Sequence, residues 1–338
     1  MKAVGYTERR PIEDPDSLRD LVLPDPTPGP HDVLVRVAAV AVNPRDLKSH
    51  RVQDATPDKP VVLGYDASGT VEAVGAAVTR FRPGDAVYYA GVLNRLGSNA
   101  ELQLVDERIV GRKPASLDHA AAASLPLTSL TAFEMLFDRL MVPRDTQTGS
   151  ALLMTGGAGG VPSIAIQLAR ALTDLVVIAS ASRPESEAWV RDLGAHAVVD
   201  HTKPLAEQVR RLDVPPVGYV FSTYTDPAVW AEFAKLIAPQ GRIGLIDDPE
   251  PLDLRPLKFK CVSIHWEAMF TRPTFATPDM ARQHEILCEV ADLVDAGRVR
   301  PTQGQHFGTI NAANLRRAHL ALSQGRAIGK IVLAGFDQ

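Results

Sequence analysis

Short apolar runs alternate with amphipathic stretches through the middle of the chain. The first run begins at Ala151 and turns through glycines into an amphipathic stretch that ends near Arg170. Further apolar runs follow at 175–179, 197–199, 217–221 and 242–246, with helical patterns at 185–193 and 228–237 between them. Short apolar strands that alternate with helices are typical of a parallel sheet covered on both faces. The pattern therefore predicts an α/β fold with a doubly wound parallel sheet of the Rossmann type.

The regions on either side have a different pattern, which is typical of β structure. Residues 32–38 alternate as a strand does, and further strand signals occur at 68–74 and 85–89 around a Pro83-Gly84 turn. Beyond residue 273, helical patterns at 278–296 and 312–323 precede a terminal apolar run, 330–333. We expect this tail to return and complete the first domain. The predicted organisation is a β-rich domain made of 1–127 and 273–338, and a doubly wound domain made of 128–272.

A glycine-rich turn follows the first strand of the doubly wound region. Gly157 is predicted to make the tight turn, and Gly159 to let the backbone approach a pyrophosphate at the helix N-terminus. Pro162 replaces the third glycine of the dinucleotide-binding pattern; proline is tolerated in a first helical turn, although we expect it to alter local packing. The predicted cofactor contacts in this turn are Gly157, Ala158, Gly159, Gly160 and Val161. The alternative is a doubly wound domain that binds no dinucleotide.

The end of the second predicted strand distinguishes the two nicotinamide cofactors. A site for NAD usually carries Asp or Glu here, which binds the ribose 2′-hydroxyl. This chain has no carboxylate between Ser180 and Pro184, and instead offers Ser182 and Arg183, both suited to a 2′-phosphate. We therefore predict NADPH rather than NADH, and we add Ser222, directly after the fourth strand, to the cofactor site. The alternative for Arg183 is a solvated loop residue.

Composition and charge exclude several other classes of protein. The chain has 338 residues and a formal net charge of −4, without a basic run of the kind that binds nucleic acid. The N-terminus lacks the apolar region of a signal peptide, and no stretch approaches the length that spans a membrane. Cys261 and Cys288 are the two cysteines, too few for a disulfide framework or a four-cysteine zinc site, and we expect both to be buried. The expected setting is a reducing cytoplasm.

Several short motifs, taken together, carry a family resemblance that covers nearly the whole chain. The motifs are Val42–Asp46, Leu63–Val71, Arg82–Asp85, Leu125–Ala132, Gly156–Val161 and Gly329–Leu333. With them the chain resembles the medium-chain dehydrogenase/reductase superfamily, in particular its zinc-free quinone oxidoreductase branch and the bacterial proteins labelled zinc-type alcohol dehydrogenase-like. The resemblance implies a GroES-like catalytic domain, a Rossmann domain, a cofactor cleft and a homodimer formed through sheet edges.

The resemblance also shows which metal ligands are missing. In zinc alcohol dehydrogenases it would place a Cys near Asn43, a His at Tyr65 and a Cys or Asp around Leu127, and none of these residues is a zinc ligand here. A catalytic zinc needs three N, S or carboxylate ligands, and the nearby Asp46 and Asp66 without His or Cys match it poorly. The cysteine-rich lobe of structural zinc is also replaced by a short loop, 89–101. We therefore predict no metal.

Without a metal, charge that develops on a substrate oxygen has to be stabilised by hydrogen-bond donors. Electron-poor acceptors, either quinones or C=C bonds conjugated to a carbonyl, are then the expected substrates. Asn43 and Tyr65 are the candidate donors, with turn stabilisation and packing as their alternative roles. The resemblance places Thr128 (catalytic) and Thr131 (cofactor) beside the nicotinamide, with helix capping as the alternative. Asp46 is expected to orient its neighbours.

The sequence thus predicts an NADPH-dependent, zinc-independent oxidoreductase that acts on a small electrophile, as a homodimer without nucleic-acid or membrane partners. Two other functions stay open. One is a zinc-dependent alcohol dehydrogenase or carbonyl reductase, which the missing ligands disfavour. The other is an NADPH-binding sensor or structural protein with little turnover, because a glycine motif reports binding and not catalysis.

Overall fold

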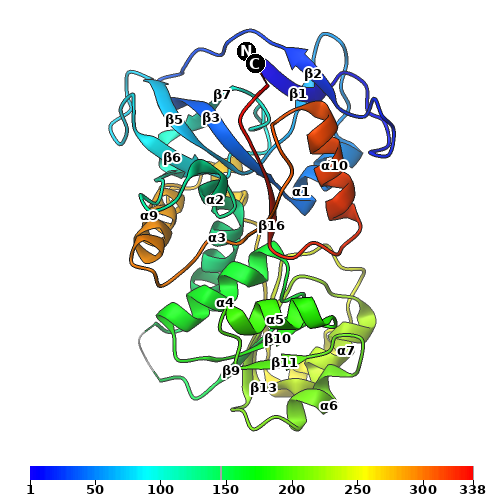
Figure 1. Ribbon diagram of the computed structural model, residues 1–338. Helices are drawn as coiled ribbons and strands as arrows, with labels where there is room; N and C mark the ends of the chain where they lie inside the picture. Colours follow the sequence, from blue (N-terminus) through cyan, green and yellow to red (C-terminus); the bar gives the residue numbers. More distant parts are fainter. Residues whose placement is uncertain (145–146, 338) are drawn as a thin grey trace. The chain divides into compact units, whose positions relative to one another are not determined.

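The computed structural model describes residues 1–144 and 147–337 (Figure 1). The chain forms two compact units. We call Met1–Leu130 together with Phe270–Gln338 the β-rich unit, and Thr131–Met269 the Rossmann unit. Among the described residues, no helix combines the length and the apolar content needed to cross a bilayer.

The Rossmann unit contains a six-stranded parallel sheet, which confirms the predicted fold class. Its strand order is β11-β10-β9-β12-β13-β14, so the order reverses direction between β9 and β12. This order is the one found in dinucleotide-binding folds, where ligands bind outside the carboxyl ends of the strands at the reversal. The strands are β9 (Ala151–Met154), β10 (Val176–Ser180), β11 (Ala197–Val199), β12 (Val217–Ser222), β13 (Ile237–Leu245) and β14 (Ser263–Trp266).

Helices follow the strands of this sheet in the order that the sequence pattern predicts. α4 (Gly160–Leu172), α5 (Pro184–Asp192) and α7 (Pro227–Leu236) correspond to the predicted helices, while the short α6 (Leu205–Arg210) and the edge strand β14 were not predicted. The prediction that the helix of α7 includes Ile237 is wrong, because Ile237 has extended backbone angles and begins β13. Strand β9 is buried along its whole length and lies inside the sheet, paired in parallel with β10 on one side and β12 on the other.

The β-rich unit contains a seven-stranded sheet with the order β15-β16-β3-β5-β6-β8, with β7 paired to β3 outside this path, and a three-stranded sheet, β2-β1-β4. Its core is an apolar cluster that includes Val35, Val71 and Leu333. The predicted return of the C-terminal tail is confirmed, because β16 pairs antiparallel with β3 and aligns Ile331 with Val42. The strands are β1 (Lys2–Tyr6), β2 (Arg19–Val22), β3 (Asp32–Val42), β4 (Val61–Val62), β5 (Ala67–Val74), β6 (Ala86–Tyr89), β7 (Leu102–Asp106), β8 (Val110–Arg112), β15 (Gln303–His306) and β16 (Lys330–Ala334).

The described helices that lie within the β-rich unit are α1 (Pro44–Val52), α2 (His119–Ala123), α8 (Thr271–Thr274), α9 (Arg282–Asp295) and α10 (Ala312–Ser323). Helix α3 (Pro126–Phe133) begins in this unit and ends in the Rossmann unit, where a π-helix, Glu134–Arg139, continues it. The expectation that both cysteines are buried is wrong. Cys261 is exposed and Cys288 is half-buried. Cys261 ends a 3-10 helix in a left-handed conformation (φ 50°), on a surface turn and not in the core.

Candidate active site

The glycine turn after β9 is shaped by Gly156 and not, as predicted, by Gly157. Gly156 has a φ of +61°, its N–H donates to Ser180 Oγ at 2.9 Å, and a Cβ there would lie 2.6 Å from Thr223 Oγ1. Gly157 has no left-handed backbone; its N–H donates to the Ser180 carbonyl at 2.9 Å. A Cβ on Gly157 would meet that same carbonyl oxygen at 2.9 Å, so its missing side chain allows close packing of the turn on β10.

The start of α4 provides backbone donors for an anion. Gly159 is the N-cap, and the first helical hydrogen bond runs from Ser163 N to Gly159 O at 3.0 Å. The N–H groups of the half-buried Gly160 and Val161 precede that bond, where a helix N-terminus binds phosphate. Pro162 lies in the same turn, and α4 continues without interruption, which confirms that proline is tolerated here. The remaining predicted residue of the turn, Ala158, is buried, with 8% of its surface exposed.

Hydroxyl groups gather at the carboxyl ends of β9 and β12. Ser222 is fully buried; its Oγ donates to the Tyr224 carbonyl at 2.8 Å and accepts from Thr225 Oγ1 at 2.9 Å. Thr155 Oγ1 lies 3.2 Å from the same Ser222 oxygen. The structure therefore makes Ser222 a residue that shapes the loop after β12. Sequence reasoning missed Thr155 and Thr225, although hydroxyl residues directly after predicted strands are a usable signal.

The predicted 2′-phosphate residues lie together on the loop after β10. Ser182 is exposed, and its Oγ lies 3.2 Å from Nε2 of His201, which sequence reasoning missed. Arg183 is half-buried, and its backbone N–H donates to Ser186 Oγ at 3.2 Å in the capping box of α5. His201 follows β11, which pairs in parallel with β10. Parallel pairing of two predicted strands could have placed this histidine beside Ser182.

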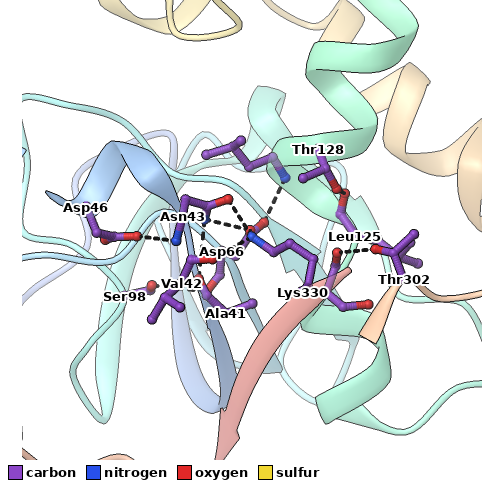
Figure 2. A network of polar contacts seen from close by, with 12 residues as sticks. Ala41, Val42, Asn43, Asp46, Asp66, Ser98, Leu125, Thr128, Thr302 and Lys330 are labelled. Atoms are coloured by element: carbon purple, nitrogen blue, oxygen red, sulfur yellow. Dashed lines mark hydrogen bonds and ion pairs between the residues drawn. The ribbon is translucent and has the colours of Figure 1, made fainter. Parts of the chain in front are cut away.

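The motifs of the β-rich unit meet at a buried ammonium group (Figure 2). Lys330 Nζ donates to Asp66 Oδ2 and to the Val42 carbonyl, both at 2.9 Å, and to Asn43 Oδ1. Asn43 Nδ2 donates to the same Asp66 oxygen at 2.8 Å. The exposed fractions of Asn43, Asp66 and Lys330 are 1%, 0% and 4%. We call these three residues the Lys330 cluster.

Two carboxyl groups at the Lys330 cluster, those of Asp66 and the nearby Asp46, have raised pKa values because they are buried. Asp66 Oδ1 accepts from the Leu127 backbone N–H at 2.7 Å. Burial raises the pKa of Asp66, whereas the Lys330 ammonium and the Leu127 N–H act in the opposite direction. Burial also raises the pKa of Asp46 to about 7, against the hydrogen bond from the Asn43 backbone N–H, which is 2.7 Å long. That hydrogen bond closes the capping box of α1, so Asp46 orients the chain at Asn43.

Tyr65, next to Asp66, has a hydroxyl that is partnered on one side. Its Oη lies 2.8 Å from Ser49 Oγ, and Ser49 Oγ accepts from Arg45 Nε at 3.2 Å. Ser49 Oγ has two lone pairs and one hydrogen, so beside the bond from Arg45 it can either donate to Tyr65 or accept from it; in the first arrangement the phenolic hydrogen of Tyr65 is left for another acceptor. The ring packs edge-on against Phe270, with 5.3 Å between centroids. Burial raises the pKa of Tyr65, which keeps the phenol protonated.

The other two predicted catalytic residues use their donors within the protein. Asn43 gives its amide hydrogens to Asp66 and to the Ala41 carbonyl, the latter at 3.3 Å. Thr128 Oγ1 donates to the Leu125 carbonyl at 3.0 Å. These contacts favour the alternative roles, turn stabilisation for Asn43 and a local backbone contact for Thr128. Thr131, predicted for the cofactor site, is buried on α3 with 6% of its surface exposed.

A parallel sheet with the dinucleotide-binding strand order, a glycine turn at its reversal and a separate β-rich unit define a two-domain oxidoreductase of the nicotinamide-dependent type. Family models agree: "Alcohol dehydrogenase GroES-like domain" matches residues 29–115, and "Zinc-binding dehydrogenase" matches residues 193–333. The chain belongs to the medium-chain dehydrogenase/reductase superfamily, among its zinc-type alcohol dehydrogenase-like members. The family resemblance and the GroES-like and Rossmann domains are thereby confirmed.

Three similar proteins illustrate the relationship. The zinc-type alcohol dehydrogenase-like protein SAR2277 of Staphylococcus aureus (strain MRSA252) is 40% identical over 336 residues, which cover 98% of this chain and 99% of the relative. A crystal structure from Rhizobium etli CFN 42, assigned as a zinc-dependent alcohol dehydrogenase, is 55% identical, with a TM-score of 0.96 and coverage of 100% and 99%. The quinone oxidoreductase of Pseudomonas syringae pv. Tomato DC3000 is 26% identical, with a TM-score of 0.81 and coverage of 98% and 99%.

Two of these names refer to zinc, and the residues of this chain do not fit that ion. A zinc site needs at least three nitrogen, sulfur or carboxylate ligands around the metal. In residues 1–144 and 147–337, no three His, Cys, Asp or Glu side chains gather to hold a metal. The Asp66 carboxylate already accepts from Leu127, Asn43 and Lys330, and the ammonium group would repel a divalent cation.

Proposed function

We propose that this oxidoreductase is NADPH-dependent and zinc-independent, and that it reduces quinones or the C=C bond of α,β-unsaturated carbonyls. The observation that carries the proposal is the Lys330 cluster. Of the three positions at which the resemblance would place zinc ligands, Asn43 lies in the cluster, the Leu127 N–H donates to Asp66, and Tyr65 offers a phenol instead of an imidazole.

The Rossmann unit supports the choice of NADPH. The Gly156 turn and the backbone N–H groups of Gly160 and Val161 fit a pyrophosphate, and Ser182 and Arg183 fit a 2′-phosphate. His201, 3.2 Å from Ser182, adds a further hydrogen-bonding group to the same place. When bound, NADPH supplies the hydride. Binding and orientation of this cofactor are the tasks that these residues perform.

Tyr65 supports the reaction type. A quinone or enone gains negative charge on its oxygen as it is reduced, and a donor fixed in advance stabilises that charge. The raised pKa of Tyr65 means that its phenol carries a hydrogen to donate across the neutral pH range. Electron-poor acceptors need no Lewis acid for this step, in line with the name of the Pseudomonas syringae relative. Tyr65 is therefore our candidate catalytic residue.

The first test is consumption of NADPH and NADH by the purified protein, with and without EDTA. The acceptors are 9,10-phenanthrenequinone, 2-cyclohexenone, crotonaldehyde and a simple aldehyde. We expect turnover of a quinone or enone with NADPH that EDTA does not change. Turnover restricted to the aldehyde and abolished by EDTA would establish a zinc alcohol dehydrogenase instead. NADPH binding without turnover of any acceptor would favour a sensor or structural role.

A pair of tyrosine variants tests the residue assignment. Tyr65→Phe removes the proposed donor and should lower kcat with little change in NADPH affinity. Tyr89→Phe is the matched control, because Tyr89 is equally buried and its hydroxyl has no hydrogen-bond partner among the described residues. Equal turnover of the two variants would disprove the role of Tyr65.

A further inference from the structure

One ammonium group joins segments that are far apart in the sequence. Lys330, at the start of β16, contacts Asn43 and Val42 at the end of β3, and Asp66 just before β5. Asp66 in turn accepts from the N–H of Leu127 in the first turn of α3. The side chain of Lys330 is 4% exposed and that of Asp66 is 0% exposed. The positions of these segments therefore depend on one buried charge pair.

The segments held in this way carry both members of the Tyr65–Ser49 pair. On one side, Asp66 directly follows Tyr65, and its backbone carbonyl accepts from Ser98 Oγ at 3.1 Å and from Ala41 N at 3.3 Å. On the other side, Asn43 is the N-cap of α1, the helix that carries Ser49. Lys330 contacts Asp66 and Asn43 directly, so it holds the segment between β4 and β5, which presents Tyr65, against the helix that presents Ser49.

We propose that Lys330 is the positioning residue of the active site, acting through Asp66 and Asn43 to hold the Tyr65 hydroxyl against Ser49. The inference rests on the proposed function, since it takes Tyr65 as the donor to the substrate oxygen. Lys330 need not touch substrate for this role. In the arrangement in which Ser49 donates to Tyr65, the phenolic hydrogen is available to the substrate.

The positioning role requires a positive charge at Lys330. Two carboxylates, Asp46 and Asp66, are buried at this point, and the ammonium lowers the energy of both in their ionised form. Without it, the buried carboxylates take up protons or draw in water, and the hydrogen bonds at Asn43 and Leu127 rearrange. Misplacement of a catalytic group by about 1 Å can cost roughly 100-fold in rate.

The experiment is a double-mutant cycle on the full chain, with Tyr65→Phe, Lys330→Met and the double variant, measured with NADPH and the best acceptor. We expect Lys330→Met to lower kcat about 10- to 100-fold, as removal of a supporting residue does elsewhere, with an unchanged NADPH Kd. If Lys330 acts through Tyr65, the double variant turns over no more slowly than Tyr65→Phe alone. Independent losses that multiply in the double variant would overturn the positioning role.

A failure of the proposed donor role of Tyr65 can be told apart from a failure of the positioning role of Lys330. Full turnover of Tyr65→Phe would overturn both the proposed donor and the positioning role, whereas a large loss in Tyr65→Phe with multiplying losses would overturn the positioning role alone. Lys330→Gln, which also removes the charge, takes the place of Lys330→Met in the cycle if the latter does not fold, and Lys330→Arg, which keeps a cation, should retain more turnover than either. Lys113→Met is the control: Lys113 also donates to backbone carbonyls of the β-rich unit, those of Pro114 and Leu117, away from the cluster. It should leave kcat unchanged.

Discussion

The glycine turn of the Rossmann unit and the Lys330 cluster of the β-rich unit are two polar sites that are built in different ways. The turn uses backbone groups, and its partners are close in sequence: Gly156 N and Ser180 Oγ are 24 residues apart. The cluster uses buried charged side chains, and Lys330 and Asp66 are 264 residues apart. Removal of a side chain should therefore damage the cluster most, whereas addition of one should damage the turn most.

The Rossmann unit has a buried charge group of its own, which sharpens the contrast. Glu267 Oε2 accepts from Arg139 Nε at 2.8 Å, and Glu134 lies beside them with one oxygen 3.8 Å from an Arg139 nitrogen. Burial and the neighbouring Glu134 raise the pKa of Glu267 to about 9. In this group, Glu134 and Glu267 lie beside one cation, Arg139, and the raised pKa of Glu267 favours its protonated form. In the Lys330 cluster, by contrast, the ammonium and two N–H groups all donate to Asp66.

The largest effect is expected from Asp66→Leu. This change leaves the buried Lys330 ammonium without its carboxylate, and breaking a buried pair in this way costs roughly 3–5 kcal/mol. The control is Glu72→Gln, which breaks the exposed pair with Arg36 and should cost at most about 1 kcal/mol. Denaturant unfolding of both variants measures the difference. Similar small losses in the two would mean that the cluster contributes no more than a surface pair.

The next effect in size is expected from Gly156→Ala. The change forces a side chain into a φ of +61° and within 2.6 Å of Thr223 Oγ1, so the turn has to shift. We expect NADPH affinity to fall about 100-fold, which corresponds to about 2.7 kcal/mol. Gly149→Ala is matched in backbone strain, with a φ of +57° and no atom within 4 Å of the new Cβ. Calorimetric titration with NADPH should detect a loss in Gly156→Ala only, and equal losses would remove the turn from the cofactor site.

A smaller effect is expected from Arg183→Ala. Loss of one charge-assisted contact to a 2′-phosphate should reduce the preference for NADPH over NADH about tenfold, equivalent to about 1.4 kcal/mol. The comparison is the ratio of kcat/KM for the two cofactors. Arg191→Ala, on the same helix and paired with Glu187, is the control that should keep the wild-type ratio. An unchanged ratio in Arg183→Ala would contradict the assignment of Arg183 to the phosphate.

The last prediction concerns pH and is read as a change in the slope of Tm. The folded state keeps Glu267 protonated up to about pH 9, whereas the unfolded chain releases this proton near the ordinary value of 4.5, so this group makes stability fall as pH rises between these values. Glu267→Gln removes the titration and should flatten the decline in Tm between pH 7 and 9 by roughly a few degrees. Glu187→Gln, at an exposed ion pair, should keep the wild-type slope. Parallel curves for wild type and Glu267→Gln would show that Glu267 is ionised at neutral pH.

Much of the fold was predictable because its signals are local. The alternation of apolar runs and helical patterns predicted the order of strands and helices from Ala151 to Leu245, and β11 at 197–199 lies where the pattern placed it. The short α6 and the edge strand β14 were missed, because each is too short for an apolar pattern to repeat and identify it as a helix or a strand. The position of the tight turn was misjudged by one residue, since Gly156 and Gly157 are equivalent in the sequence and only their packing against Thr223 and Ser180 separates them.

The candidate site was predictable only as a set of motifs. Asn43, Tyr65 and Thr128 lie in separate segments, and no pattern in the sequence indicates that Lys330 connects the segments around them. The choice between a substrate donor and a structural role depended on which hydrogens are already used. Asn43 and Thr128 donate within the protein, whereas the Tyr65 hydroxyl contacts Ser49 Oγ, which can donate to it and so leave the phenolic hydrogen for a substrate.

The sequence by itself determined most strands and helices of the Rossmann unit, the presence of a glycine turn after β9 and the absence of a carboxylate after β10, because each depends on neighbours along the chain. Only the tertiary structure decided that Lys330, Asp66 and Asn43 share one buried site, because β16 pairs with β3 and carries the ammonium across 264 residues to Asp66. A buried charge is stable only where other parts of the chain supply its partners. Those partners are set by strand pairing between distant segments, which the order of residues alone does not show.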